Sequence, residues 1–195
     1  MVLLLEKITD QLTVHPDRTW DQFKLMEQAL SGSLGTRLAY FEGTIEVFMP
    51  GLAHEIFRKI IGYLIETFFL EQQVQVIPMG SVTQEKLGTI SVQADESYCI
   101  GNLKEFPDLA IEVFFTSGGP SKLARYELLG VSEVWFWQDG VFNLYRLRTD
   151  GYEIIDQSEI PELKTLDLEL LTQCVLIGET DWLGAVNLFK QGIRN

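Results

Sequence analysis

The sequence predicts an α/β fold in which a mixed β-sheet is flanked by helices, as a single domain over residues 1–195. A strand, a helix and a second strand follow one another between residues 108 and 137, the order of a parallel β-unit. Hairpin signals lie on both sides of that unit, and hairpins add antiparallel strands to a sheet. A long helix with a wide apolar stripe is suited to cover such a sheet.

The first half of the chain is expected to form two helices and a hairpin. Thr19 and Gln22 stand at the positions of a capping box, and apolar residues follow at helical spacing. Apolar pairs later recur every four positions, as in a helix that packs flat on a sheet. In chain order, the predicted elements are a helix over 19–30, strands over 38–41 and 44–48, and a helix over 53–71.

The second half is expected to be mainly strands. Residues 108–115 are almost continuously apolar, which is typical of a strand covered on both faces, and Glu112 interrupts the run. Gly130 is placed to end a short helix, and Asp139-Gly140 is a two-residue hairpin turn. The predicted elements are strands over 74–79, 90–94, 108–115, 134–137 and 141–147, a helix over 121–129, then another strand after residue 152 and helices near 166–173 and 181–191.

Composition excludes several classes of protein. The chain is 46% hydrophobic and 22% charged, which rules out disorder as its main state. No apolar run approaches the ~20 residues of a membrane span, and the first five residues lack the cationic flank of a signal peptide. We therefore expect a cytoplasmic protein with no membrane partner. Cys99 and Cys174 have no CxxC spacing and are expected to be buried small side chains.

The net charge of the chain is −13. This charge argues against a protein that holds nucleic acid mainly by bulk charge, because such binding depends on Lys and Arg neutralising phosphates. A local cationic or metal-loaded cleft is still compatible with this charge.

Two carboxylates mark a candidate site. Glu112 lies inside an apolar strand, where an unpaired ion costs several kcal/mol to desolvate. Asp95, expected at the end of the neighbouring strand 90–94, would join it as a hard oxygen ligand for Mg²⁺ or Mn²⁺. Spacing alone leaves an alternative open, in which Glu112 points into solvent near a strand end and Asp95 is an ordinary loop residue.

Lys122 opens the helix that follows the Glu112 strand, so its side chain can reach back over the end of that strand. A cation at this place would position a water molecule or stabilise a phosphorane oxygen. The alternative is a solvated surface lysine.

Several blocks of the sequence match those of a known family. The blocks are residues 40–47, Pro50, 54–55, 80–81, 94–102, 107–113, 116–118, 122–123, Tyr126 and 130–135. In this order they resemble the Uma-two-type restriction endonucleases, which are PD-(D/E)XK-like proteins, over about residues 19–175. The resemblance implies a restriction-endonuclease-like core, to which the N-terminal segment and the C-terminal helix are peripheral.

The resemblance also implies a site and an activity. Asp95 and Glu112 would be metal ligands for Mg²⁺ or Mn²⁺, with the carbonyl of Val113 as a third ligand. Lys122 would replace the lysine normally found two residues after the glutamate, where this chain has Phe114. The activity implied is metal-dependent endonuclease cleavage of DNA phosphodiester bonds. The main alternative is a catalytically inactive nuclease-fold domain that binds nucleic acid or protein; a small-molecule hydrolase is less favoured.

Glu46 and His54 also match family positions and are candidate accessory residues beside the metal. For Glu46 the alternative is an exposed hairpin carboxylate, and for His54 capping or packing is favoured. Trp135 and Trp137 share one face of a strand, where packing in the core or in a dimer interface is favoured over base stacking. A homodimer is expected from the resemblance alone.

Overall fold

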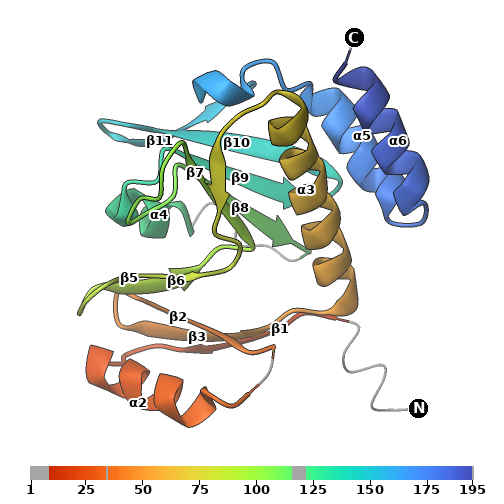
Figure 1. Cartoon of the computed structure of the whole chain (residues 1–195). Coiled ribbons are helices and arrows are strands. Elements are labelled where there is room, and N and C mark those ends of the chain that lie inside the picture. The colour runs from red at the N-terminus through yellow and green to blue at the C-terminus, as the bar shows by residue number, and fades with distance from the viewer. Residues whose placement is uncertain (1–8, 34, 116–121, 195) are drawn as a thin grey trace, which may run out of the picture. The chain divides into compact units, whose positions relative to one another are not determined.

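The computed structural model describes residues 9–33, 35–115 and 122–194 (Figure 1). The backbone contacts divide the chain into two compact units. Unit 1 comprises residues 1–55 and 82–93, and unit 2 comprises residues 56–81 and 94–195. The architecture is mixed α/β, as the sequence predicts, whereas the assignment of one domain to the whole chain stays a prediction. No helix in the described ranges is long and apolar enough to cross a membrane.

Unit 1 is built on an antiparallel sheet with the strand order β1-β3-β2-β6-β5. Helix α2 (Trp20–Leu30) packs on this sheet through a small core of Phe23, Tyr40 and Ile45. The capping box is present, because Thr19 Oγ1 accepts from Gln22 N and Gln22 Oε1 accepts from Thr19 N. The strands are β1 (Gln11–His15), β2 (Arg37–Phe41), β3 (Thr44–Met49), β5 (Thr83–Lys86) and β6 (Ile90–Gln93).

Unit 2 contains a mixed sheet with the strand order β11-β10-β9-β8-β7-β4. Strands β8 and β9 are parallel, and the other pairs formed by described residues are antiparallel. The strands are β4 (Val76–Pro78), β7 (Glu96–Ile100), β8 (Leu109–Phe114), β9 (Glu133–Gln138), β10 (Val141–Arg148) and β11 (Gly151–Ile155). The helices are α3 (Leu52–Glu71), which starts in unit 1, α4 (Leu123–Leu129), the 3₁₀ turn η2 (Pro161–Leu163), α5 (Leu168–Gly178) and α6 (Trp182–Gly192).

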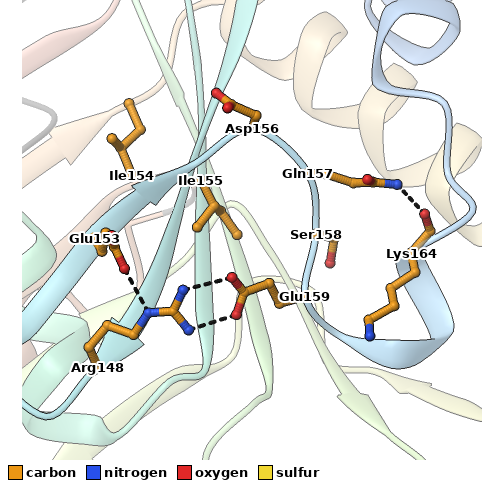
Figure 2. A pocket seen from close by; sticks show the side chains of 9 residues that line it. All are labelled: Arg148, Glu153, Ile154, Ile155, Asp156, Gln157, Ser158, Glu159 and Lys164. Carbon is orange, nitrogen blue, oxygen red and sulfur yellow. Dashed lines mark hydrogen bonds and ion pairs between the residues drawn. The ribbon is translucent and has the colours of Figure 1, made fainter.

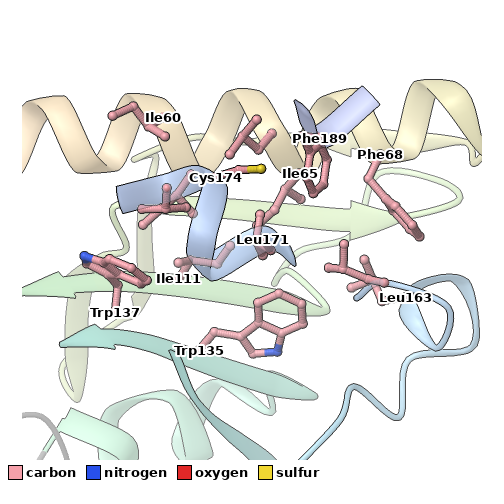
Figure 3. Close-up of a cluster of buried hydrophobic side chains, with 14 of the residues drawn as sticks. Ile60, Ile65, Phe68, Ile111, Trp135, Trp137, Leu163, Leu171, Cys174 and Phe189 are labelled. Atoms are coloured by element: carbon pink, nitrogen blue, oxygen red, sulfur yellow. The ribbon is translucent and has the colours of Figure 1, made fainter. Parts of the chain in front are cut away.

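The main core of unit 2 lies between one face of this sheet and the helices α3, α5 and α6 (Figure 3). Ile111, Trp135 and Trp137 point into this core, and the two tryptophans are 0% and 2% exposed. Their expected packing role is therefore confirmed. Cys99 and Cys174 are both buried free thiols, as predicted.

The opposite face of the sheet carries the side chains that alternate with this core. Because neighbouring residues of a strand point to opposite faces, Glu112 lies on the other side of the sheet from Ile111 and Val113. Phe114 shares that side and packs edge-on against Phe136, with 5.1 Å between the ring centroids. Helix α4 covers this face, and the candidate site lies beneath it.

Two expectations about the strands are corrected by the structure. Residues 90–94 were expected to form the neighbour of the Glu112 strand, but β6 (Ile90–Gln93) pairs with β2 and β5 in unit 1. The neighbour of β8 is β7, whose sequence ESYCI begins with a charge and lacks a continuous apolar run. Strands β1 and β5 were missed for a similar reason, because their sequences QLTVH and TQEK are largely polar. The start of the helix predicted over 121–129 lies outside the described residues, which resume at Lys122.

Candidate active site

Glu112 is the centre of the candidate site. It lies within β8 and is only 3% exposed, so the alternative in which it points into solvent is wrong. The hydroxyl of Tyr126 donates a short hydrogen bond to Glu112 Oε1. The ammonium of Lys122 donates to Glu112 Oε2 at 3.2 Å. Each oxygen of this buried carboxylate therefore has a partner, which offsets the cost of removing its charge from water.

Both partners of Glu112 come from one short helix, α4. Lys122 occupies the N-cap position of α4, and Tyr126 follows one turn later on the same face. Gly130 ends the helix in the left-handed conformation at φ 75°, as the sequence predicts. The Lys122 ammonium also lies 4.5 Å from the centroid of the Phe114 ring, which favours a cation there. The side chain of Lys122 is 26% exposed, so it faces both Glu112 and solvent.

Tyr126 is a permanent donor in this arrangement. Burial raises the pKa of its phenol well above the ordinary value, because the phenolate would have to exist away from water. The negative charge of Glu112 beside it, the hydrogen bond to that carboxylate and the more distant charge of Asp95 raise the pKa further. The hydroxyl therefore stays protonated in the folded protein.

Asp95 lies immediately before β7 and is 1% exposed. In the β7–β8 ladder Glu96 is opposite Ile111, so the register brings Asp95 to the level of Glu112. The Asp95 N–H donates to the carbonyl of Ile111 at 3.1 Å, and the Val113 N–H donates to Asp95 Oδ2 at 2.7 Å. Asp95 is thus held by the two residues that flank Glu112, and the interpretation of it as an ordinary loop residue is wrong.

The donor chemistry of this site fits a small hard cation. The buried carboxylates of Glu112, within β8, and Asp95, immediately before β7, carry oxygen atoms of the type that Mg²⁺ and Mn²⁺ prefer as ligands. The Lys122 ammonium already places a positive charge against one oxygen of Glu112. Within the described ranges, no group of three or more His, Cys, Asp or Glu side chains is arranged to hold a metal. Further ligands would therefore be backbone oxygens, water and substrate, as is usual for Mg²⁺.

The two candidate accessory residues lie in unit 1. Glu46 is a half-buried residue of β3, opposite Val14 of β1. His54 lies in the first turn of α3 and is 1% exposed. Its Nδ1 is 3.1 Å from Asp10 Oδ2, and its ring packs against Phe48 with 5.2 Å between centroids. These contacts support the packing interpretation of His54, and an accessory role for either residue stays a prediction.

Two arginines of β10 are engaged by carboxylates at the surface of unit 2. Arg148 donates to both oxygens of Glu159 and to Glu153, and these residues line an open pocket of about 580 Å³ (Figure 2). Arg146 lies 3.5 Å from Glu133 and 3.9 Å from Glu159. These guanidinium groups are therefore already neutralised by neighbouring acids and do not form a basic patch.

Sequence reasoning missed two functionally or structurally important side chains. Tyr126 was recognised only as part of a sequence block, although its spacing of four residues from Lys122 could have placed both on one helix face. Glu133, at the start of β9, is 0% exposed and accepts four hydrogen bonds. The donors are Trp135 Nε1, Ser158 Oγ and the backbone N–H groups of Glu159 and Ile160. This carboxylate joins the chain after β11 to the sheet.

The fold is that of a nuclease-like protein. It is similar to the crystal structure of a protein from Anabaena variabilis described as "a putative nuclease belonging to DUF820", with a TM-score of 0.55. The sequence identity is 18%, over 80% of this chain and 98% of the other, so the likeness concerns the fold. The family model Uma2, described as "Putative restriction endonuclease", matches residues 20–176. The chain therefore belongs to the Uma2 family, as its sequence blocks indicate. No curated protein matches it.

Proposed function

We propose that this protein is a metal-dependent endonuclease that hydrolyses phosphodiester bonds in DNA, with Mg²⁺ or Mn²⁺ as cofactor. The observation that carries the proposal is the buried Glu112, which faces the Lys122 ammonium and lies level with the buried Asp95. A charged group inside an apolar strand is costly, so its retention favours a chemical role. Membership of the Uma2 family supports the same class of activity.

Asp95 and Glu112 would hold the metal ion, with the carbonyl of Val113 as a third protein ligand. When bound, the ion supplies an activated water and neutralises charge that develops at phosphorus. The Val113 N–H orients Asp95, and Tyr126 orients Glu112. Fixed ligands of this kind lower the reorganisation that the reaction would otherwise require.

Lys122 would act on the substrate side of the site. Its ammonium is partly exposed and contacts Glu112 Oε2, so it lies beside the proposed ligand and within reach of solvent. In that place it would orient the attacking water, in line with the bond to the leaving oxygen, and donate to a phosphorane oxygen in the transition state. Its cation would be held in position by the Phe114 ring.

The proposal is tested by metal titration and plasmid cleavage on the same samples. Wild type is expected to bind Mg²⁺ and Mn²⁺ and to cut DNA. Glu112→Ala should lose both, whereas Lys122→Ala should lose cutting and retain most metal binding. Lys164→Ala removes an exposed lysine elsewhere in unit 2 and serves as the matched control. Cleavage by purified Glu112→Ala at the wild-type rate would refute the proposal.

A second candidate function is binding of nucleic acid or protein without cleavage. The net charge of −13 and the neutralisation of Arg146 and Arg148 by carboxylates favour its protein-binding form, since both disfavour a DNA-binding surface based on charge. Wild type that neither binds metal nor cuts DNA would support this candidate. The homodimer and the cytoplasmic location stay predictions.

A further inference from the structure

We infer that Tyr126 makes the metal site selective for small octahedral cations over Ca²⁺, by holding one oxygen of Glu112. This inference rests on the proposed function, because it concerns the cation held by Glu112 and Asp95. It assigns to Tyr126 a positioning role, exerted through Glu112.

The two oxygens of Glu112 face different partners. Oε1 accepts from the uncharged hydroxyl of Tyr126, which is 0% exposed. Oε2 faces the partly exposed ammonium of Lys122 at 3.2 Å. The ammonium thus marks Oε2 as the oxygen that meets a cation, whereas Oε1 is directed into the protein.

Asp95 likewise gives one of its two carboxylate oxygens to a donor within the protein. Its Oδ2 accepts a hydrogen bond at 2.7 Å from the backbone N–H of Val113, which is also an uncharged donor. Each of the two proposed ligands therefore commits one oxygen to the protein. The partly exposed ammonium of Lys122 can move aside when a cation binds Oε2, whereas the buried hydroxyl of Tyr126 stays on Oε1, so Glu112 is arranged as a monodentate ligand.

Tyr126 is held firmly in this place. Its backbone carbonyl accepts hydrogen bonds from the N–H groups of Gly130 and Val131 at the end of α4. If its hydroxyl left Glu112 it would be a buried donor without a partner, which is energetically unfavourable. The hydrogen bond is therefore expected to persist when a cation binds.

Monodentate carboxylates discriminate between cations. Mg²⁺ requires near-octahedral geometry and is usually bound by one or two carboxylates, with water completing its shell. Ca²⁺ accepts more oxygen ligands and commonly takes a carboxylate through both oxygens. By withholding Oε1, Tyr126 would remove a ligand that Ca²⁺ could use and that Mg²⁺ does not need.

The test compares cation affinities of the full chain by isothermal titration. In Tyr126→Phe, we expect Mg²⁺ to bind about tenfold more weakly, the usual size of effect when a ligand loses its supporting hydrogen bond. Ca²⁺ should lose less or bind more tightly, so the ratio of the two affinities shifts toward Ca²⁺. Tyr152→Phe is the control, because it removes a half-buried tyrosine hydroxyl, which donates to the Val131 carbonyl. An unchanged ratio in folded Tyr126→Phe would overturn the inference.

A measurement on the wild-type protein gives a second test, which does not require any variant to fold. Infrared difference spectra of the carboxylate stretches separate monodentate from bidentate ligation. Protein with ¹³C-labelled glutamate should show monodentate Glu112 with Mg²⁺ and also with Ca²⁺, and a bidentate signature with Ca²⁺ would refute the inference.

Glu112→Ala distinguishes the failure of the proposed metal site from the failure of the role inferred for Tyr126. If it binds Mg²⁺ as wild type does, the proposed metal site fails, whereas Glu112-dependent binding with an unchanged cation ratio overturns only the role of Tyr126.

Discussion

The backbone N–H of Val113 donates a hydrogen bond to Asp95 Oδ2 at 2.7 Å, so the carboxylate of Asp95 is fastened to the residue that follows Glu112. The two acidic residues belong to neighbouring segments of chain, and this bond fixes them to each other through the backbone of β8. Their relative position therefore depends on the pairing of β7 with β8 and not on flexible side chains.

Asp95→Asn should separate the charge of this residue from its hydrogen bond. The amide oxygen can still accept from the Val113 N–H, so we expect little change in the free energy of unfolding. Affinity for Mg²⁺ should fall at least about tenfold, because a ligand charge is lost. Titration calorimetry checks this, with exposed Asp156→Asn as the control. Equal Mg²⁺ affinity in Asp95→Asn and wild type would contradict the prediction.

Glu133→Ala should be strongly destabilising. It would leave the buried donors of Trp135 and Ser158 without the carboxylate that accepts from them, and that carboxylate is 0% exposed. We expect the free energy of unfolding to fall by about 3–5 kcal/mol in urea denaturation. Glu153→Ala, which breaks an exposed ion pair with Arg148, should cost less than about 1 kcal/mol. Similar losses in the two variants would show that Glu133 does not anchor this segment.

Glu66→Gln should stabilise the protein near neutral pH. Burial raises the pKa of the Glu66 carboxyl above its ordinary value of 4.5, and the charge of Lys59 offsets this only in part. Folding therefore favours the protonated carboxyl. The stability that this contributes is fully present below the pKa that Glu66 has in the unfolded chain, and it is lost as the pH rises through the pKa that Glu66 has in the folded protein. Neutralising the residue should raise the free energy of unfolding at pH 7, and the gain should vanish below the unfolded pKa.

Glu71→Gln, on the same helix as Glu66, is the control, because the opposite change in the free energy of unfolding is expected at pH 7. The hydrogen bond from Arg194 lowers the pKa of the Glu71 carboxyl, so its ionised form is favoured by folding. This contribution exists above the unfolded pKa and is lost as the pH falls through the folded pKa. Glu71→Gln should therefore destabilise at pH 7 and have no effect in acid. Urea denaturation at both pH values checks the pair, and effects of the same sign would contradict the assignment.

Gly62→Ala should destabilise α3 although alanine is the better helix former. A Cβ at this position would lie 3.1 Å from the carboxyl carbon of Glu96, which is held by Arg58. Crowding of this buried pair should outweigh the gain of about 1 kcal/mol in helix propensity. Gly32→Ala meets nothing within 4 Å and should change stability by less than about 0.5 kcal/mol. Thermal unfolding distinguishes these outcomes, and a higher melting temperature for Gly62→Ala would contradict the prediction.

Local signals in the sequence were sufficient for most helices and hairpins. The capping box at Thr19, the apolar periodicity of α3 and the Asp139-Gly140 turn each specify structure within a few residues. Strands β1, β5 and β7 were not predicted, because their polar sequences become strands only through pairing with distant partners. The division into two sheets depends on those same long-range pairings.

The part of the candidate site that could be predicted from the sequence is the part that depends on the cost of removing a carboxylate from water. A carboxylate within an apolar strand needs a partner, which made Glu112 a candidate, and the family resemblance implied its role. Asp95 was correctly expected on a segment next to it, but that segment is β7 and not the strand over residues 90–94. The spacing from Lys122 could place Tyr126 on the same helix face, but it could not predict the contact with Glu112, because a buried tyrosine in a short helix is equally compatible with ordinary core packing.

The four side chains of the site all lie between residues 95 and 126, on a strand pair and the helix that follows it. Their arrangement is thus encoded by one short stretch of chain, while β9, β10, β11 and the C-terminal helices contribute support. During evolution, substitutions and insertions elsewhere can accumulate without displacing these groups. Members of such a family can therefore diverge widely in overall sequence and still inherit the same local constellation as a unit.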